Sequence, residues 1–143
     1  METALNYSKI KKMLRNREAN LPKFDILNFI SQSVNQNGIN VEGQELLLRV
    51  LDRKDDFLEY ADIVISLIRQ YGLYPYLKNF ELSLSDEVAC EIHKPDGLRN
   101  IVFHSKQNEI YYTLIHKGNI VLSAPTSFGK SLIIDSILSL IHI

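Results

Sequence analysis

The stretch from Asn119 to Ser131 reads NIVLSAPTSFGKS and decides how we interpret the fold. Its apolar run, Ile120–Leu122, predicts a buried strand, and the sequence that follows Lys130 predicts an almost wholly apolar helix. A strand, then a loop ending in Gly-Lys-Ser, then a helix is the order that a phosphate-binding loop requires. In such a loop, backbone N–H groups and the positive end of the helix surround an anion.

The loop departs from the general pattern G-x-x-x-x-G-K-[ST], because Ala124 occupies the place of the first glycine. The form Ala-x-Thr-x-x-Gly-Lys-Ser resembles motif I of superfamily 2 helicases, of the DEAD/DEAH-box or Ski2-like branches. Ser127 stands where many members have a second glycine. The same phrase also looks like prokaryotic defence-associated helicases. The resemblance covers roughly residues 98–143, about a third of the chain.

A glutamine upstream of the loop adds to this resemblance. Gln107 lies 23 residues before Lys130, and superfamily 2 helicases are similar in placing an adenine-reading glutamine about that far upstream. An amide side chain can donate to adenine N7 and accept from its N6 amino group, which guanine cannot match. The resemblance therefore implies that Gln107 binds adenine.

The resemblance implies ATP and Mg²⁺ as cofactors, and DNA or RNA as a partner. Lys130 would reach the β- and γ-phosphates, and the Ser131 hydroxyl would ligate Mg²⁺. The residues implied in phosphate binding are Ala124, Pro125, Thr126, Ser127, Phe128, Gly129, Lys130 and Ser131.

The rest of the chain predicts a mostly α fold. We expect a helical N-terminal extension over residues 1–97, followed over 98–143 by the first helix, strand, phosphate-binding loop and helix of a RecA-like α/β domain. The extension should form a small bundle. Its expected core residues are Ile26, Leu27, Phe29 and Ile30 on one side, and Leu47, Leu48, Leu51, Ile65 and Ile68 on the other.

Charge is unevenly distributed along the chain. The net charge is −1, made up of +4 in residues 1–23, −6 in residues 24–100 and +1 in residues 101–143. The basic residues of the first predicted helix favour a solvated face, with contact to a phosphate backbone as the alternative. A single cysteine, no signal peptide and no apolar run of membrane-spanning length predict a cytoplasmic protein with no membrane partner.

We therefore expect the N-terminal portion of an ATP-dependent DNA or RNA helicase or translocase. Hydrolysis in that class needs an acidic residue on a second strand, which holds Mg²⁺, and arginine fingers from a second domain. This sequence contains neither, so we expect no useful ATP hydrolysis by this chain alone. The apolar last helix predicts that the remainder of the helicase or another protein chain covers it. The alternatives are another P-loop NTPase, or a non-enzymatic helical adaptor with a vestigial P-loop.

Overall fold

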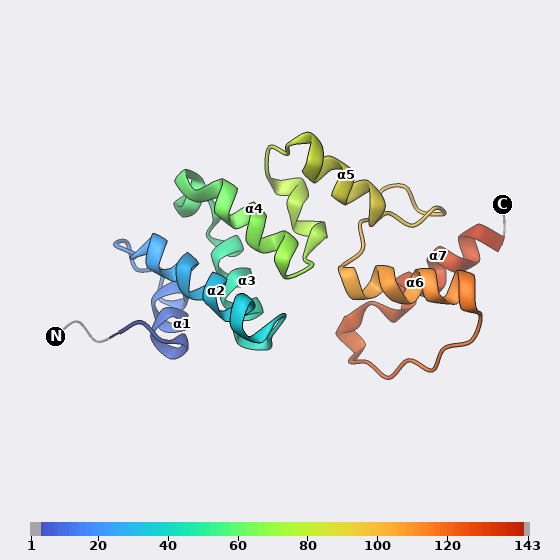
Figure 1. Cartoon of the computed structure of the whole chain (residues 1–143), viewed down its shortest axis with the longest axis horizontal. Helices are drawn as coiled ribbons and strands as arrows, with labels where there is room; N and C mark the ends of the chain where they lie inside the picture. The colour runs from blue at the N-terminus through green and yellow to red at the C-terminus, as the bar shows by residue number, and fades with distance from the viewer. Residues whose placement is uncertain (1–3, 142–143) are drawn as a thin grey trace. The chain divides into compact units, whose positions relative to one another are not determined.

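The computed structural model describes residues 4–141, and every regular element in that range is a helix (Figure 1). The prediction of a mostly α fold is confirmed. The α-helices are α1 (Tyr7–Arg15), α2 (Lys23–Asn37), α3 (Val41–Asp52), α4 (Ala61–Gln70), α5 (Leu84–Ile92), α6 (Ser105–Lys117) and α7 (Lys130–Ile141). The 3₁₀-helices are η1 (Lys54–Tyr60), η2 (Tyr74–Asn79) and η3 (Thr126–Phe128).

The predicted strand Ile120–Leu122 is wrong. Between α6 and η3 the chain has no regular secondary structure, and no strand occurs anywhere in residues 4–141. A strand requires a neighbour whose N–H and C=O groups complete its hydrogen bonds, so an apolar run alone cannot form one. The expected helix–strand–loop–helix unit is therefore a helix–loop–helix unit in this structure.

The chain forms two compact units, Met1–Tyr71 and Gly72–Ile143. The predicted domain boundary after residue 97 stays a prediction. Residues 1–3 and 142–143 lie outside the described range, and so does the end, at Ile143, of the domain predicted over residues 98–143.

The first unit is a helical bundle with its core around α3. Helix α3 packs against α1 and α2, and α2 also packs against α4. The expected core residues Ile26, Leu27, Ile30, Leu47, Ile65 and Ile68 are buried. Phe29, Leu48 and Leu51 are only half-buried. Residues that the predicted bundle had not included complete the core: Ile10, Leu14, Leu46, Val50, Phe57, Val64, Leu67 and Tyr71.

Polar side chains fix the starts of three helices. The side chain of Asn6 accepts a hydrogen bond from the N–H of Lys9 at 2.9 Å, and that of Asn40 accepts from the N–H of Gly43 at 2.8 Å. The hydroxyl oxygen of Ser83 caps α5 in the same way. Each side chain satisfies a backbone donor that the first helical turn leaves unpaired.

The second unit has a smaller core, in which α6 packs against α7. Phe103, Tyr111 and Ile133 are its buried centre, and the rings of Phe103 and Tyr111 meet edge to face with centroids 5.6 Å apart. Half-buried apolar side chains surround this centre: Ile101, Ile110, Tyr112, Leu114, Phe128, Leu132, Ile137 and Leu140. Phe128 thereby ties the loop before α7 to the core.

Candidate functional site

The loop between α6 and α7 depends on a glycine at its last position. Gly129 has φ +83° and ψ 34°, the left-handed conformation that glycine adopts without steric cost. A Cβ atom at this position would lie 2.6 Å from Nε2 of Gln107. Both the backbone conformation and the close approach of Gln107 therefore require glycine here, and α7 begins at the next residue.

Gln107 joins α6 to this loop. The residue is 7% exposed, and its Oε1 accepts a hydrogen bond from the backbone N–H of His104 at 3.0 Å. Its Nε2 donates to the carbonyl oxygen of Phe128 at 2.8 Å. The predicted adenine-binding residue therefore lies against the predicted phosphate-binding loop, and both ends of its amide hold protein groups. Adenine binding by Gln107 stays a prediction.

The lysine of the loop turns back onto the backbone. Lys130 Nζ donates to the carbonyl oxygen of Ala124 at 2.6 Å. The side chains of Thr126, Ser127 and Ser131 are exposed. A phosphate that replaced the Ala124 carbonyl as the acceptor of Lys130 would lie near this ammonium and near the first N–H groups of α7.

Two hydrogen bonds between side chains and backbone hold α6 and α7, the helices on either side of this loop, to the turn at residues 96–97. The hydroxyl of Tyr111 accepts from the N–H of Asp96 at 3.2 Å. The hydroxyl of Ser139 donates to the carbonyl of Gly97 at 3.0 Å. A Cβ atom at Gly97 would lie 2.9 Å from the side chain of Ser139, so α7 approaches this turn closely.

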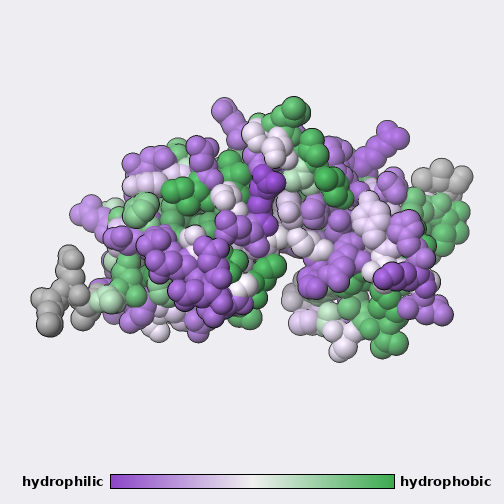
Figure 2. All heavy atoms as spheres, viewed as in Figure 1, coloured by the Kyte–Doolittle hydropathy of each residue, from purple (hydrophilic) through white to green (hydrophobic). Residues whose placement is uncertain are grey.

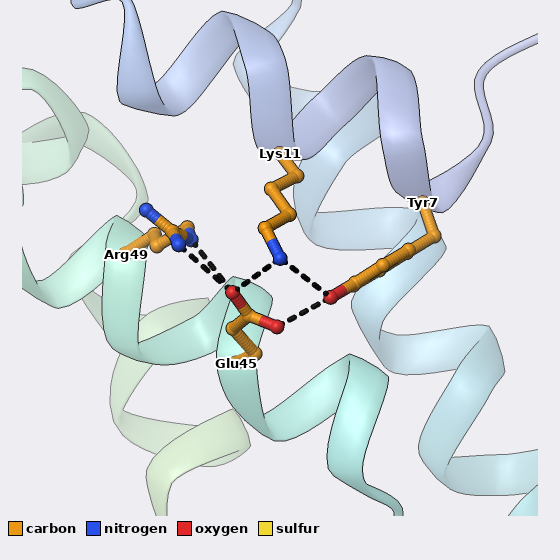
Figure 3. A network of polar contacts seen from close by, with 4 residues as sticks. All are labelled: Tyr7, Lys11, Glu45 and Arg49. Atoms are coloured by element: carbon orange, nitrogen blue, oxygen red, sulfur yellow. Dashed lines mark hydrogen bonds and ion pairs between the residues drawn. The ribbon is translucent and has the colours of Figure 1, made fainter.

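The basic face of α1 is partly neutralised by α3. Figure 3 shows Tyr7 and Lys11 of α1 reaching Glu45 of α3, which also binds Arg49. Lys11 Nζ lies 2.9 Å from Glu45 Oε1, and Arg49 Nη2 lies 2.8 Å from the same oxygen. Hydrogen bonds from Tyr7, Arg49 and Lys11 lower the pKa of Glu45 from 4.5 to about 2. This network holds two helices together.

Other charged residues of the first unit also form ion pairs. Arg17 Nη2 lies 3.6 Å from Asp52 Oδ2, and Lys23 Nζ lies 3.0 Å from Glu59 Oε1. The buried Arg53 donates to the carbonyl of Glu18 at 2.9 Å and to Asp56 at 2.8 Å. These acidic and basic residues therefore link helices and loops within the unit.

Residues 4–141 contain no cluster of metal-binding side chains and no membrane-spanning helix. No group of three His, Cys, Asp or Glu side chains in that range could hold a metal ion. None of the described helices is both long enough and apolar enough to cross a bilayer.

The chain resembles proteins of bacterial defence against phage. A family model described as the Anti-bacteriophage protein B N-terminal domain matches residues 1–87. Anti-bacteriophage protein B of Escherichia coli (strain K12) is 41% identical over 100 residues, which are 68% of this chain. The chain covers only 14% of that protein's length. No solved structure matches the chain.

These matches contradict the predicted recognition as a superfamily 2 helicase fragment. The prediction that the chain is part of an ATP-binding hydrolase is therefore also wrong. The prediction rested on Gln107 and on the short loop from Ala124 to Ser131, both outside the region that the family model matches. A motif of eight residues is a weak guide to a family when its structural context, here a paired strand, is not observed.

Proposed function

The chain belongs to the family of the Anti-bacteriophage protein B N-terminal domain, and we propose that it acts as a helical adaptor in a defence protein of that kind. An adaptor is a rigid domain that presents surfaces to other protein segments without catalysing a reaction. The role fits the alternative that the sequence left open, a non-enzymatic helical domain.

One observation carries this proposal. The matched residues 1–87 comprise the bundle α1–α4, η2 and the start of α5, and charged side chains there hold the helices to one another. Lys11 of α1 binds Glu45 of α3, and Lys23 of α2 binds Glu59 of η1. Such a network supports a rigid scaffold, because helices held by packing and hydrogen bonds present surface residues in fixed positions.

Phage challenge of cells that express the whole defence protein tests the adaptor role. Leu47→Asp puts a charge into the fully buried centre of the bundle and should abolish protection, measured as plaquing efficiency at matched protein level. Lys130→Ala alters the loop alone and should leave protection intact. Protection that survives Leu47→Asp, or is lost with Lys130→Ala, would contradict the adaptor proposal.

A second candidate function is nucleotide binding without hydrolysis at the loop from Ala124 to Ser131. The left-handed Gly129 immediately before α7 supports it, because phosphate-binding loops place such a glycine before a helix. ATP and Mg²⁺ would be the ligands, with Lys130 at the phosphates, Ser131 at the metal and Gln107 at adenine. Bound nucleotide would supply only ordering of the loop.

Thermal unfolding with and without Mg·ATP tests this second function. A ligand at about 100 times its Kd stabilises the folded state by about 2.7 kcal/mol, which raises Tm. Lys130→Ala should remove that rise, whereas the exposed Lys117→Ala should keep it. Gln107→Ala should weaken the binding of ATP more than the binding of GTP. If neither ATP nor GTP raises Tm, the loop does not bind nucleotide and this second function is wrong.

We propose protein, and not nucleic acid, as the partner class. DNA or RNA was implied by the helicase resemblance, which the family match contradicts. Pairing of Lys11 with Glu45 and of Arg17 with Asp52 reduces the positive charge that α1 offers to a phosphate backbone.

A covering polypeptide on α7 is part of the same proposal. Ile134, Leu138 and Ile141 are exposed along one side of this helix. Exposed apolar side chains at such spacing favour packing against another element. The curated relative is several times longer than the region it shares with this chain, so its further sequence is one source of such an element.

A further inference from the structure

Helix α5 carries an apolar ridge on its outer face. Leu84, Val88 and Ile92 are 77%, 50% and 58% exposed. A spacing of four residues places them in a single row along the helix, about 12 Å long. Figure 2 shows hydrophobic atoms at the surface over α5.

The opposite face of α5 is fixed to the second unit. Asp86 and Ala89 are buried, and the ring of His93 stacks on Tyr74 of η2 with centroids 3.6 Å apart. The N–H of Phe103 donates to the carbonyl of His93 at 2.8 Å. Because one face is anchored at both its middle and its end, the ridge is held facing outward on a rigid helix.

One side of the ridge is acidic. Glu87 and Glu91 are exposed and follow Leu84 by three and seven residues, which places both beside the row. Glu91 also pairs with Lys94. A partner for this surface must therefore match apolar side chains and a negative flank.

We propose that α5 docks an amphipathic helix of a partner protein, one whose apolar face receives Leu84, Val88 and Ile92 and whose basic residues face Glu87 and Glu91. A row at four-residue spacing fits between the rows of a second helix, which is the commonest way in which helices pack. Opposite charges beside the apolar contact fix the orientation and exclude acidic helices. The inference rests on the adaptor role and names the surface that the adaptor uses.

The probe is a fluorescent amphipathic peptide of about 20 residues, roughly 30 Å long as a helix, with leucine on one face and lysine on the other. A matched peptide carries glutamate in place of lysine. We expect the Leu/Lys peptide to bind the full chain by anisotropy, and the Leu/Glu peptide to bind at least tenfold more weakly. No binding of the Leu/Lys peptide, or equal binding of both, would overturn the proposal.

Two variants locate the binding. Val88→Glu should weaken the Leu/Lys peptide about tenfold or more, because it places a charge in the middle of the apolar contact. Val41→Glu is the matched control: Val41 is the more exposed valine, it lies on the other unit, and its change should leave binding within about twofold. Both side chains are exposed, and circular dichroism checks that both variants fold. Equal losses in the two variants would overturn the assignment to α5.

A charge reversal tests the acidic flank. Glu87→Lys combined with Glu91→Lys should make the chain prefer the Leu/Glu peptide over the Leu/Lys peptide. An unchanged preference would overturn the basic character of the partner. Concentration-dependent dimerisation that Val88→Glu abolishes would make the occupant a second copy of this chain and overturn the proposal.

The outcomes separate this inference from the adaptor role itself. If Leu47→Asp abolishes phage protection but Val88→Glu affects neither protection nor peptide binding, the docking surface is wrong and the adaptor stands. If the peptide binds at α5 but Leu47→Asp preserves protection, the surface stands and the adaptor role is wrong.

Discussion

The side-chain amide of Gln107 donates a hydrogen bond to the carbonyl oxygen of Phe128 at 2.8 Å, across 21 residues of sequence. The same amide accepts from the N–H of His104. A single nearly buried side chain therefore connects the start of α6 to the loop that precedes α7.

Gln107→Ala should destabilise the chain by about 1–3 kcal/mol, because it leaves the two backbone partners of the amide without their hydrogen bonds. Urea unfolding measures the change. Gln107→Glu keeps the acceptor for His104 but loses the donor to Phe128, so we expect an intermediate or larger loss. The exposed Gln70→Ala, whose amide donates to Ser66 at 3.3 Å, is the control. Equal small losses at positions 107 and 70 would contradict a structural role for Gln107.

A second prediction concerns Gly43, where α3 meets Tyr71. A Cβ atom at Gly43 would lie 1.9 Å from the hydroxyl oxygen of Tyr71, which itself donates to the carbonyl of Ile30 at 3.3 Å. Gly43→Ala should cost about 1–3 kcal/mol by overpacking, which exceeds the gain of about 0.5–1 kcal/mol from replacing glycine within a helix. In a Tyr71→Phe background the cost should fall, since the closest atom is gone. If Gly43→Ala costs the same in the Tyr71→Phe background, the hydroxyl oxygen of Tyr71 is not the source of the strain.

A third prediction concerns Glu45 and pH. Its folded pKa of about 2 lies below the ordinary 4.5, so the unfolded chain takes up the proton first as pH falls. The stabilisation from this carboxylate should be complete above about pH 4.5 and should be lost as pH falls towards about 2. The stability difference between the natural chain and Glu45→Gln should shrink over that window. Glu81 is exposed, and the stability difference between the natural chain and Glu81→Gln should stay small over the same pH range.

The sequence predicted the helical bundle because its apolar residues recur at helical spacing. Ile26, Leu27 and Ile30 are buried where that spacing placed them. Helix starts were less predictable: we did not predict that Asn40 caps α3, since the local pattern alone does not say which of several polar residues lies at the first turn.

The apolar residues of α5 show where the pattern misleads. Ala89 is buried, but Val88 and Ile92 are exposed, because η2 packs against this helix on one face and leaves the face of Val88 and Ile92 open. For the same reason the apolar run Ile120–Leu122 resembled a buried strand without being one. Hydropathy measures which residues gain from burial, but it does not say whether another element of the chain supplies the cover.

The resemblance predicted that Gln107 and the loop bind parts of one nucleotide, and the structure shows Gln107 in contact with the loop itself. The amide bonds to backbone groups of His104 and Phe128. Contacts of this kind depend on the three-dimensional approach of α6 to Gly129, which no local pattern encodes.

The last prediction concerns the loop segment from Ile120 to Leu122. Within the described residues, these backbone N–H groups have no acceptor in any turn, cap or loop hydrogen bond, and the side chain of Val121 is fully exposed. Amides without intramolecular partners exchange with solvent at nearly the unfolded rate, whereas amides of core helices exchange only on larger opening. Hydrogen exchange of the chain should therefore be fast at Ile120–Leu122 and slow at Leu46 and Leu47 of α3. A polypeptide that covers α7 and pairs with this segment should slow the exchange there and leave α3 unchanged. Slow exchange at Ile120–Leu122 in a monomeric sample, with no added partner, would mean that the segment is already paired within the chain.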